Sequence, residues 1–200
     1  MILIEVEVKI QISDPFFLRN KFKQLGGIYK LSLIHEDIYY NMPTGLRDFA
    51  KTDEALRIRS STEYKNGEKN KTEKKVFYLT YKGKKLDQIS KSRHEIELKL
   101  ENANSMKEIL ANLGFREILT VKKERELYEF EYKDNKIEAL LDYLPALNSY
   151  FLEVELIAQS SEELSEKRDQ LFRFLLEFGY TQKDSITESY LELIIKKSKK

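Results

Sequence analysis

Polar and apolar residues alternate strictly along residues 4–10, close to the start of the chain. A period of two is typical of a β-strand whose two faces have different environments. One face carries Glu5, Glu7 and Lys9, and the other carries Ile4, Val6, Val8 and Ile10. A half-buried surface strand would show the same alternation, so this stretch does not identify a site by itself.

The same pattern, with two glutamates separated by one apolar residue, occurs twice more. The pairs are Glu95 with Glu97 in residues 93–100, and Glu153 with Glu155 in residues 151–156. Each copy is followed by a segment that predicts a helix ending at glycine, in residues 14–27, 105–114 and 161–179. A unit of strand and helix that occurs three times carries more weight than any single match.

The remaining segments predict further strands and one more helix. Strands are favoured at residues 28–41, 55–59, 76–82 and 137–143, and two strands within residues 117–132. The polar residues 61–75 contain an Asn-Gly pair and predict a long hairpin connection, and residues 83–92 predict a basic loop. Residues 185–188 match a capping box and predict the start of a last helix that runs through Ile195.

Composition narrows the class of protein. The chain has 200 residues, of which 41% are hydrophobic, and a formal net charge of +1. This size suits one compact domain over residues 1–200, and the balanced charge predicts no nucleic-acid or membrane partner. No secretory signal is visible and there is no cysteine, which predicts a cytoplasmic protein without disulfides or thiolate metal sites.

Charged residues of one sign form doublets on one face of nearly every predicted strand. A closed antiparallel β-barrel of about eight strands, with helices outside, would gather them in one charged tunnel, which makes the fold α+β. The apolar residues Ile4, Val6, Val8, Ile96, Leu98, Val154 and Leu156 would then point outward beneath the helices. Clustered carboxylates bind hard divalent cations, and clustered arginines and lysines bind phosphates. The pattern therefore predicts a site for a metal-bound polyphosphate.

With these motifs in this order, the chain resembles the CYTH superfamily, also called triphosphate tunnel metalloenzymes. This superfamily includes class IV adenylyl cyclases, thiamine triphosphatases and inorganic triphosphatases. The resemblance spans nearly the whole chain, and its motifs match Glu5, Glu7, Lys9, Arg57, Arg59, Lys82, Arg93, Glu95, Glu97, Lys123, Arg125, Asp142, Glu153 and Glu155. The chain departs from the family at residues 61–75 and at Asn148, where a turn glycine is usual. Asparagine tolerates left-handed backbone, so we expect this turn to survive.

The resemblance implies a role for each motif. Glu5, Glu7, Glu153 and Glu155 would hold Mg²⁺ or Mn²⁺. Glu95 and Glu97 would complete a second metal site or support the basic residues, and Asp142 would meet the metal or orient a basic neighbour. The triphosphate would be bound by Lys9, Arg57, Arg59, Lys82, Arg93, Lys123 and Arg125. Lys82 and Tyr39 are the candidates for a general base. His35 and His94 lie outside the motifs and are interpreted as structural.

Three functions remain open at this point. The first is hydrolysis of a triphosphate-containing substrate, such as inorganic, nucleoside or thiamine triphosphate. The second is conversion of ATP to cyclic AMP and pyrophosphate, which would need contacts to adenine that the sequence does not reveal. The third is a non-catalytic module that binds polyphosphate or nucleotide. It ranks last because every carboxylate pair is present. A homodimer is left open.

Overall fold

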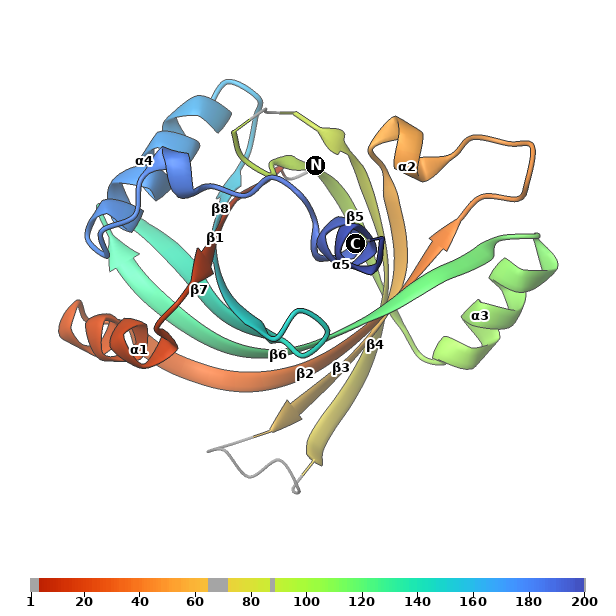
Figure 1. Ribbon diagram of the computed structural model, residues 1–200, viewed down its shortest axis with the longest axis horizontal. Helices are drawn as coiled ribbons and strands as arrows, with labels where there is room; N and C mark the ends of the chain where they lie inside the picture. The colour runs from red at the N-terminus through yellow and green to blue at the C-terminus, as the bar shows by residue number, and fades with distance from the viewer. Residues whose placement is uncertain (1–3, 65–71, 87–88, 200) are drawn as a thin grey trace.

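The computed structural model describes residues 4–64, 72–86 and 89–199 (Figure 1). In chain order its elements are β1 (Ile4–Ile12), α1 (Pro15–Gln24), β2 (Ile28–Asn41), α2 (Phe49–Thr52), β3 (Ala55–Tyr64), β4 (Thr72–Lys85), β5 (Arg93–Leu100), α3 (Ala103–Asn112), β6 (Arg116–Tyr132), β7 (Asn135–Leu144), β8 (Ser149–Ala158), α4 (Leu164–Leu176), the 3₁₀ turn η1 (Gln182–Asp184) and α5 (Tyr190–Ser198).

The strands form a closed antiparallel barrel in the order β1-β5-β4-β3-β2-β6-β7-β8, which confirms the predicted fold class. Strand β1 closes the ring, because it pairs with β8 at one edge and with β5 at the other. Within the described residues, nine residues of β1 pair with β8, and Ile4 and Glu5 pair with β5. Closure brings strands that are distant in sequence around one interior.

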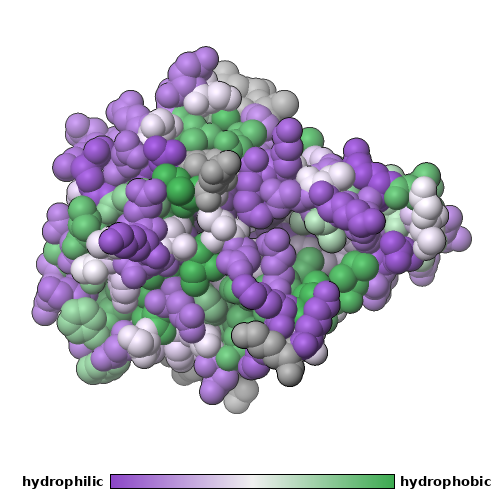
Figure 2. Space-filling view, turned by 45° about the horizontal axis from the view of Figure 1, so that its top comes forward, coloured by the Kyte–Doolittle hydropathy of each residue, from purple (hydrophilic) through white to green (hydrophobic). Residues whose placement is uncertain are grey.

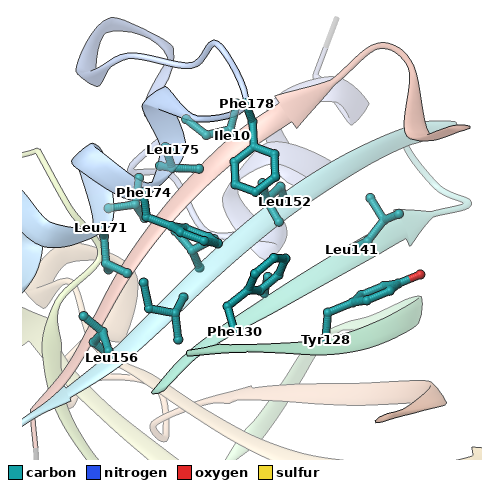
Figure 3. Close-up of a cluster of buried hydrophobic side chains, with 14 of the residues drawn as sticks. Ile10, Tyr128, Phe130, Leu141, Leu152, Leu156, Leu171, Phe174, Leu175 and Phe178 are labelled. Carbon is teal, nitrogen blue, oxygen red and sulfur yellow. The ribbon is translucent and has the colours of Figure 1, made fainter. Parts of the chain in front are cut away.

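The largest apolar core lies outside the barrel, between the strands and the helices α1 and α4. Figure 3 shows side chains of α4 and the following turn, including Leu171 and Phe174, above residues of the strands such as Leu152. The predicted outward residues of β1 and β8 are buried there; Val6 and Val154 have no exposed surface. A buried side chain of this size contributes roughly 2 kcal/mol, so this face stabilises the barrel strongly.

The outer face of β5 differs from this prediction. Ile96 and Leu98 point outward as the alternation requires, but they are 55% and 57% exposed. Among the described residues, α3 instead packs its Leu110 with Leu56 and Ile58 of β3. The alternation therefore identified the outward face of β5 correctly, while the expected cover over it was wrong.

Several element boundaries also differ from the sequence-based expectation. Strand β6 is one continuous strand of 17 residues, not two strands, because it pairs with both β2 and β7 along its length. The expected connection at 61–75 is partly strand, since Thr62 pairs with Lys75 between β3 and β4; residues 65–71 lie outside the described part. Strand β4 also continues to Lys85, into the expected basic loop.

The last helix begins later than predicted and lies in the opening of the barrel. It starts at Tyr190, where Ser189 and Glu192 form the capping box; the similar pattern four residues earlier does not cap a helix. There, Ile186 donates its backbone N–H to the carbonyl of Lys9 at 2.8 Å and ties the chain to β1. Figure 1 shows α5, with the C-terminus, inside the ring of strands. Not all helices therefore pack outside the barrel.

Two other local predictions are confirmed. Asp14 caps α1 by accepting from the backbone N–H of Phe17 at 2.8 Å, and Pro15 opens the helix. Asn148 has a φ of 50°, the left-handed conformation expected at this turn. No helix in the described ranges is long and apolar enough to cross a membrane.

Candidate functional site

The inward faces of the strands enclose a cavity of about 790 Å³. Many hydrophilic residues also lie on the outer surface (Figure 2), so polarity alone does not mark a site. Inside the barrel, however, charged side chains are buried: Lys9 has no exposed surface, and Glu7 and Glu153 are each 4% exposed. Buried charges require partners or ions, and the pairing inside the barrel separates three groups of residues.

The first group joins Asp37 of β2 to two arginines of β3. Arg59 is the direct neighbour of Asp37 across the strands, and its Nε and Nη2 donate to the two carboxylate oxygens at 2.7 Å each. Arg57 donates through Nη1 to the same carboxylate at 3.4 Å. Burial would raise the pKa of Asp37, but Arg59 and Arg57 hold it well below its usual range. This carboxylate is ionised and fixes the direction of both guanidinium groups.

The second group repeats this arrangement around Asp142 of β7. Arg125 of β6 donates to its two oxygens at 2.6 and 2.7 Å, and Lys123 donates to one of them at 3.1 Å. The hydroxyl of Tyr190, from α5, donates to the same carboxylate at 2.9 Å. Asp142 has no exposed surface. Since its oxygens are already engaged, the geometry favours an orienting role for Asp142 over metal binding.

The third group is an acidic cluster of Glu7, Glu153 and Glu155, defined by carboxylate oxygens that all lie within 4.8 Å of one another. Glu7 of β1 is directly opposite Glu155 of β8, and like charges in this position destabilise a sheet unless something neutralises them. Burial and the neighbouring Glu153 raise the pKa of Glu7 to about 7. Burial, Glu5 and Glu7 raise the pKa of Glu155 well above its usual value. The cluster therefore retains protons near neutral pH.

Glu5 lies beside the acidic cluster but has a basic neighbour. Burial would raise its pKa, but Lys82, whose Nζ is 3.6 Å from Glu5, holds it at about 2. Lys82 also forms a hydrogen bond with Glu95. Glu97 accepts a hydrogen bond from the hydroxyl of Thr80 at 2.9 Å. The middle carboxylate pair thus lies against Lys82 and Thr80, and Glu95 also borders Glu5: burial and the charge of Glu5 raise the pKa of Glu95.

The remaining predicted residues also reach the cavity or its border. Arg93 lines it, donates to the carbonyl of Gly83 at 3.2 Å and lies 3.8 Å from Asp53. Tyr39, which lines the cavity, is opposite Arg57 across the strands. Lys9 donates to the backbone carbonyl of Glu188, just before α5.

Two lysines in the tunnel have a lowered pKa. Burial and the neighbouring Lys91 lower the pKa of Lys9 to about 7. Burial and Arg125 lower the pKa of Lys123 to about 8. An anionic ligand placed among these groups would be stabilised by their charge and would favour their protonated forms.

The acidic cluster fits a divalent cation. Its three carboxylates supply the oxygen ligands that Mg²⁺ and Mn²⁺ prefer, and their mutual repulsion is relieved by a cation. Burial first, and then this repulsion, raise the pKa values of Glu7 and Glu155. Glu5 lies at the edge of this group, whereas Glu95, Glu97 and Asp142 have other partners in the described structure.

The comparisons with known proteins agree with this geometry. The model of the CYTH domain family matches residues 3–190. The chain belongs to the CYTH domain family. A CYTH relative from Methanocaldococcus jannaschii, whose name proposes adenylate cyclase activity, is 38% identical over 192 residues, which cover 96% of this chain and 98% of the relative.

Solved structures show the same fold. The PH1819 protein of Pyrococcus horikoshii has a TM-score of 0.82 and 37% identity, over 96% of this chain and 99% of that one. HpAC1 from Hippeastrum, for which a dominant triphosphatase activity is described, has a TM-score of 0.59 and 16% identity over 98% and 96% of the two chains. At that identity the likeness extends to the CYTH fold and not to the reaction.

Lys91 and Tyr190 were missing from the sequence-based prediction of the site, whereas His35 was named there and interpreted as structural. Lys91 contacts two glutamates of the acidic cluster, but it lies in the expected basic loop, two residues before β5 begins, so no strand alternation marked it. Tyr190 had no sequence signal, because its position depends on where α5 packs. His35 is buried near Arg59 and Lys123; burial and these cations lower its pKa well below the usual value.

Proposed function

We propose that this protein is a divalent-metal-dependent hydrolase of triphosphate-containing substrates that releases phosphate. The observation that carries the proposal is the meeting of opposite charges in one cavity. The acidic cluster lies at β1 and β8, while the arginines around Asp37 and Asp142 come from β3 and β6. A cavity of about 790 Å³ falls in the range of small-molecule sites. A triphosphate carrying a metal ion matches both signs of charge.

In this proposal each group has a separate task. Glu7, Glu153 and Glu155, with Glu5 beside them, hold Mg²⁺ or Mn²⁺. The bound metal supplies neutralisation of phosphate charge and, at neutral pH, a hydroxide nucleophile. Arg57, Arg59, Lys123 and Arg125, with Lys9, Lys82 and Arg93, bind and align the phosphate chain in a site preorganised by Asp37 and Asp142.

The arginine geometry limits how phosphate is held. Arg59 uses Nε and Nη2 for Asp37, and Arg125 uses the same two atoms for Asp142. The Nη1 groups are the donors left over from these forks, so they are the atoms proposed to bind phosphate oxygens. Tyr39 and Lys82 remain the proposed general bases. Lys9 and Lys123 are further candidates, since their pKa values lie near neutrality.

Cyclisation of ATP is the second candidate. The 38% identical relative whose name proposes adenylate cyclase activity favours it. The cavity lining also includes the apolar residues Phe49, Ile118, Leu191 and Ile195, against which an organic group such as adenine could pack. The purely binding function keeps its last rank, because the acidic cluster is complete.

Product analysis tests the proposal. Purified protein is incubated with inorganic triphosphate or with ATP, in Mg²⁺ or Mn²⁺ and in EDTA. Orthophosphate that appears only with metal is the expected result. Cyclic AMP with pyrophosphate would favour the cyclase, and tight binding without any product would favour the binding module. A Glu36→Gln protein, assayed in the same way, is the control for substitutions of carboxylates inside the tunnel. Glu36 is half-exposed and pairs only with surface Lys122 in the described structure.

A further inference from the structure

The acidic cluster is already in contact with cations of the protein itself: Arg125 donates to Glu153 at 2.5 Å, and Lys91 reaches two of the three carboxylates. The Nζ of Lys91 forms hydrogen bonds with Glu7 and, at 2.8 Å, with Glu153. The three side chains are buried, with 10%, 6% and 5% of their surfaces exposed. A single ammonium therefore lies between two of the three carboxylates that form the cluster.

The backbone around Lys91 is anchored, so this contact is part of the fold. The N–H of Lys91 donates to the carbonyl of Glu7 at 2.9 Å, and the N–H of Leu86 donates to the carbonyl of Ser92 at 2.8 Å. Ser185 donates its hydroxyl to the carbonyl of Ile89 at 2.9 Å. These bonds bring the root of the Lys91 side chain to β1, while the four-carbon side chain leaves its ammonium able to move.

A divalent cation and this ammonium compete for the same two carboxylates. Lys91 occupies one oxygen of Glu7 and one of Glu153, and two cations a few ångströms apart in a buried site repel strongly. We propose that Lys91 is an internal competitor of the divalent cation, neutralising Glu7 and Glu153 in the metal-free protein and moving away when the metal binds. The inference rests on the metal site in the proposed function, but it does not depend on the reaction.

The position of Tyr190 indicates where the displaced ammonium goes. The Nζ atoms of Lys9, Lys123 and Lys91 lie 4.3, 5.1 and 5.7 Å from the centroid of its ring. Lys91 thus borders two of the lysines proposed to bind phosphate. Its release from the glutamates adds one positive charge to the phosphate side of the cavity. Metal and polyphosphate would then strengthen the binding of each other, because such coupling is reciprocal.

Metal titration without substrate tests this role. The affinity for Mn²⁺ is measured by isothermal titration calorimetry at one pH and ionic strength, for the wild type, Lys91→Met and Lys91→Arg. Lys91→Met removes the competing charge and should bind Mn²⁺ about tenfold more tightly. Lys91→Arg keeps the competitor and should bind no more tightly than the wild type. Lys122→Met is the matched control, since it removes one positive charge from an exposed ion pair with Glu36 and should match the wild type.

Thermal unfolding gives an independent readout. In EDTA, Lys91→Met should melt at a lower temperature than the wild type, because Glu7 loses its cationic partner and Glu153 keeps, among the described residues, only Arg125 and Lys123. Excess Mn²⁺ should raise its melting temperature more than that of the wild type. If Lys91→Met does not fold in either condition, Lys91→Gln replaces it in both measurements, as it keeps a donor without the charge.

Several results would overturn the inference. They are a Lys91→Met or Lys91→Gln protein that binds Mn²⁺ with wild-type or weaker affinity, a melting temperature in EDTA equal to that of the wild type, and Mn²⁺ binding in none of the proteins. Failure to hydrolyse any triphosphate would count against the proposed function alone, since neither readout measures turnover.

Discussion

Asp37 and Glu155 are both buried carboxylates in the same tunnel, yet their surroundings are opposite. Asp37 faces two arginines, and its pKa lies well below the usual range. Glu155 faces other glutamates, and its pKa lies well above the usual value. The first carboxylate is satisfied by the protein itself, whereas the second has repulsive glutamate neighbours that outweigh the attraction of Arg125, so a proton or an added cation would stabilise it. This difference distinguishes carboxylates that hold the site together from carboxylates that are proposed to bind a ligand. Four experiments test whether the distinction is correct.

The largest expected effect comes from the acidic cluster. Glu7→Gln keeps the shape of the side chain but removes a proposed metal ligand, so turnover of triphosphate should fall by at least about a hundredfold at saturating metal. The circular dichroism spectrum should not change. Glu36→Gln, the control outside the tunnel, should keep full activity. Normal turnover in Glu7→Gln would contradict the assignment of the metal site.

The next prediction concerns the free energy of unfolding, which should respond differently to substitutions at Asp37 and at Glu155. Asp37→Asn leaves Arg57 and Arg59 without their buried partner, so the free energy of unfolding should fall by about 3 kcal/mol, with or without Mn²⁺. Glu155→Gln resembles the protonated carboxyl and should cost little in EDTA, but it should lose the stabilisation that Mn²⁺ gives to the wild type. Denaturant unfolding with EDTA or Mn²⁺ measures both. If both variants lose the same free energy of unfolding in EDTA and respond equally to Mn²⁺, Asp37 and Glu155 do not have the different roles described above.

A smaller effect tests how Asp37 orients its partners. Arg59→Lys keeps the charge but cannot make two parallel hydrogen bonds to Asp37, so kcat/KM should fall about tenfold. Arg59→Ala should lose more. Inorganic triphosphate should compete for the site, whereas adenosine should not. Competition by adenosine as strong as that of triphosphate would place recognition in the base and favour the cyclase.

The smallest effect is the pH dependence of metal binding. Glu7, with a pKa raised to about 7 by burial and Glu153, holds a proton below that pH, and the metal must displace it. Affinity for Mn²⁺ should therefore rise about fivefold between pH 6 and pH 7, where Glu7 loses its proton. Asp37 stays ionised over this pH range, so it does not contribute to the pH dependence of Mn²⁺ affinity. A flat titration profile would contradict the protonated state of the cluster.

The faces of the strands could be predicted from the sequence, because a period of two depends only on local backbone geometry. Arg57, Glu95 and Glu153 all lie in or beside the cavity as expected. The charge doublets on the strand faces suggested a closed tunnel, and the family resemblance supported it, since alternation alone fits an open sheet as well. Contacts between residues on different strands could be predicted less well from the sequence. Asp142 was a candidate metal ligand, but its position beside Arg125 depends on the register between β6 and β7.

The errors concern features that only tertiary packing decides. Two capping-box patterns lie four residues apart near the end of the chain, and propensity does not choose between them. The hydrogen bond between Ile186 and β1 keeps residues 185–188 out of the helix, so the helix begins at Tyr190. The exposure of Ile96 has the same origin, since alternation shows which side chains point outward but not which helix covers them.

The pairing of the first strand with the last one has a consequence for synthesis on the ribosome. Glu7 is made early, but its neighbours Glu153 and Glu155 belong to β8, nearly 150 residues later. Until β8 leaves the exit tunnel, β1 lacks the partner for its whole length and the nascent chain has no acidic cluster. Contacts so far apart in sequence slow folding. The seam at β1 and β8 therefore makes the proposed metal site one of the last parts of the molecule to be assembled.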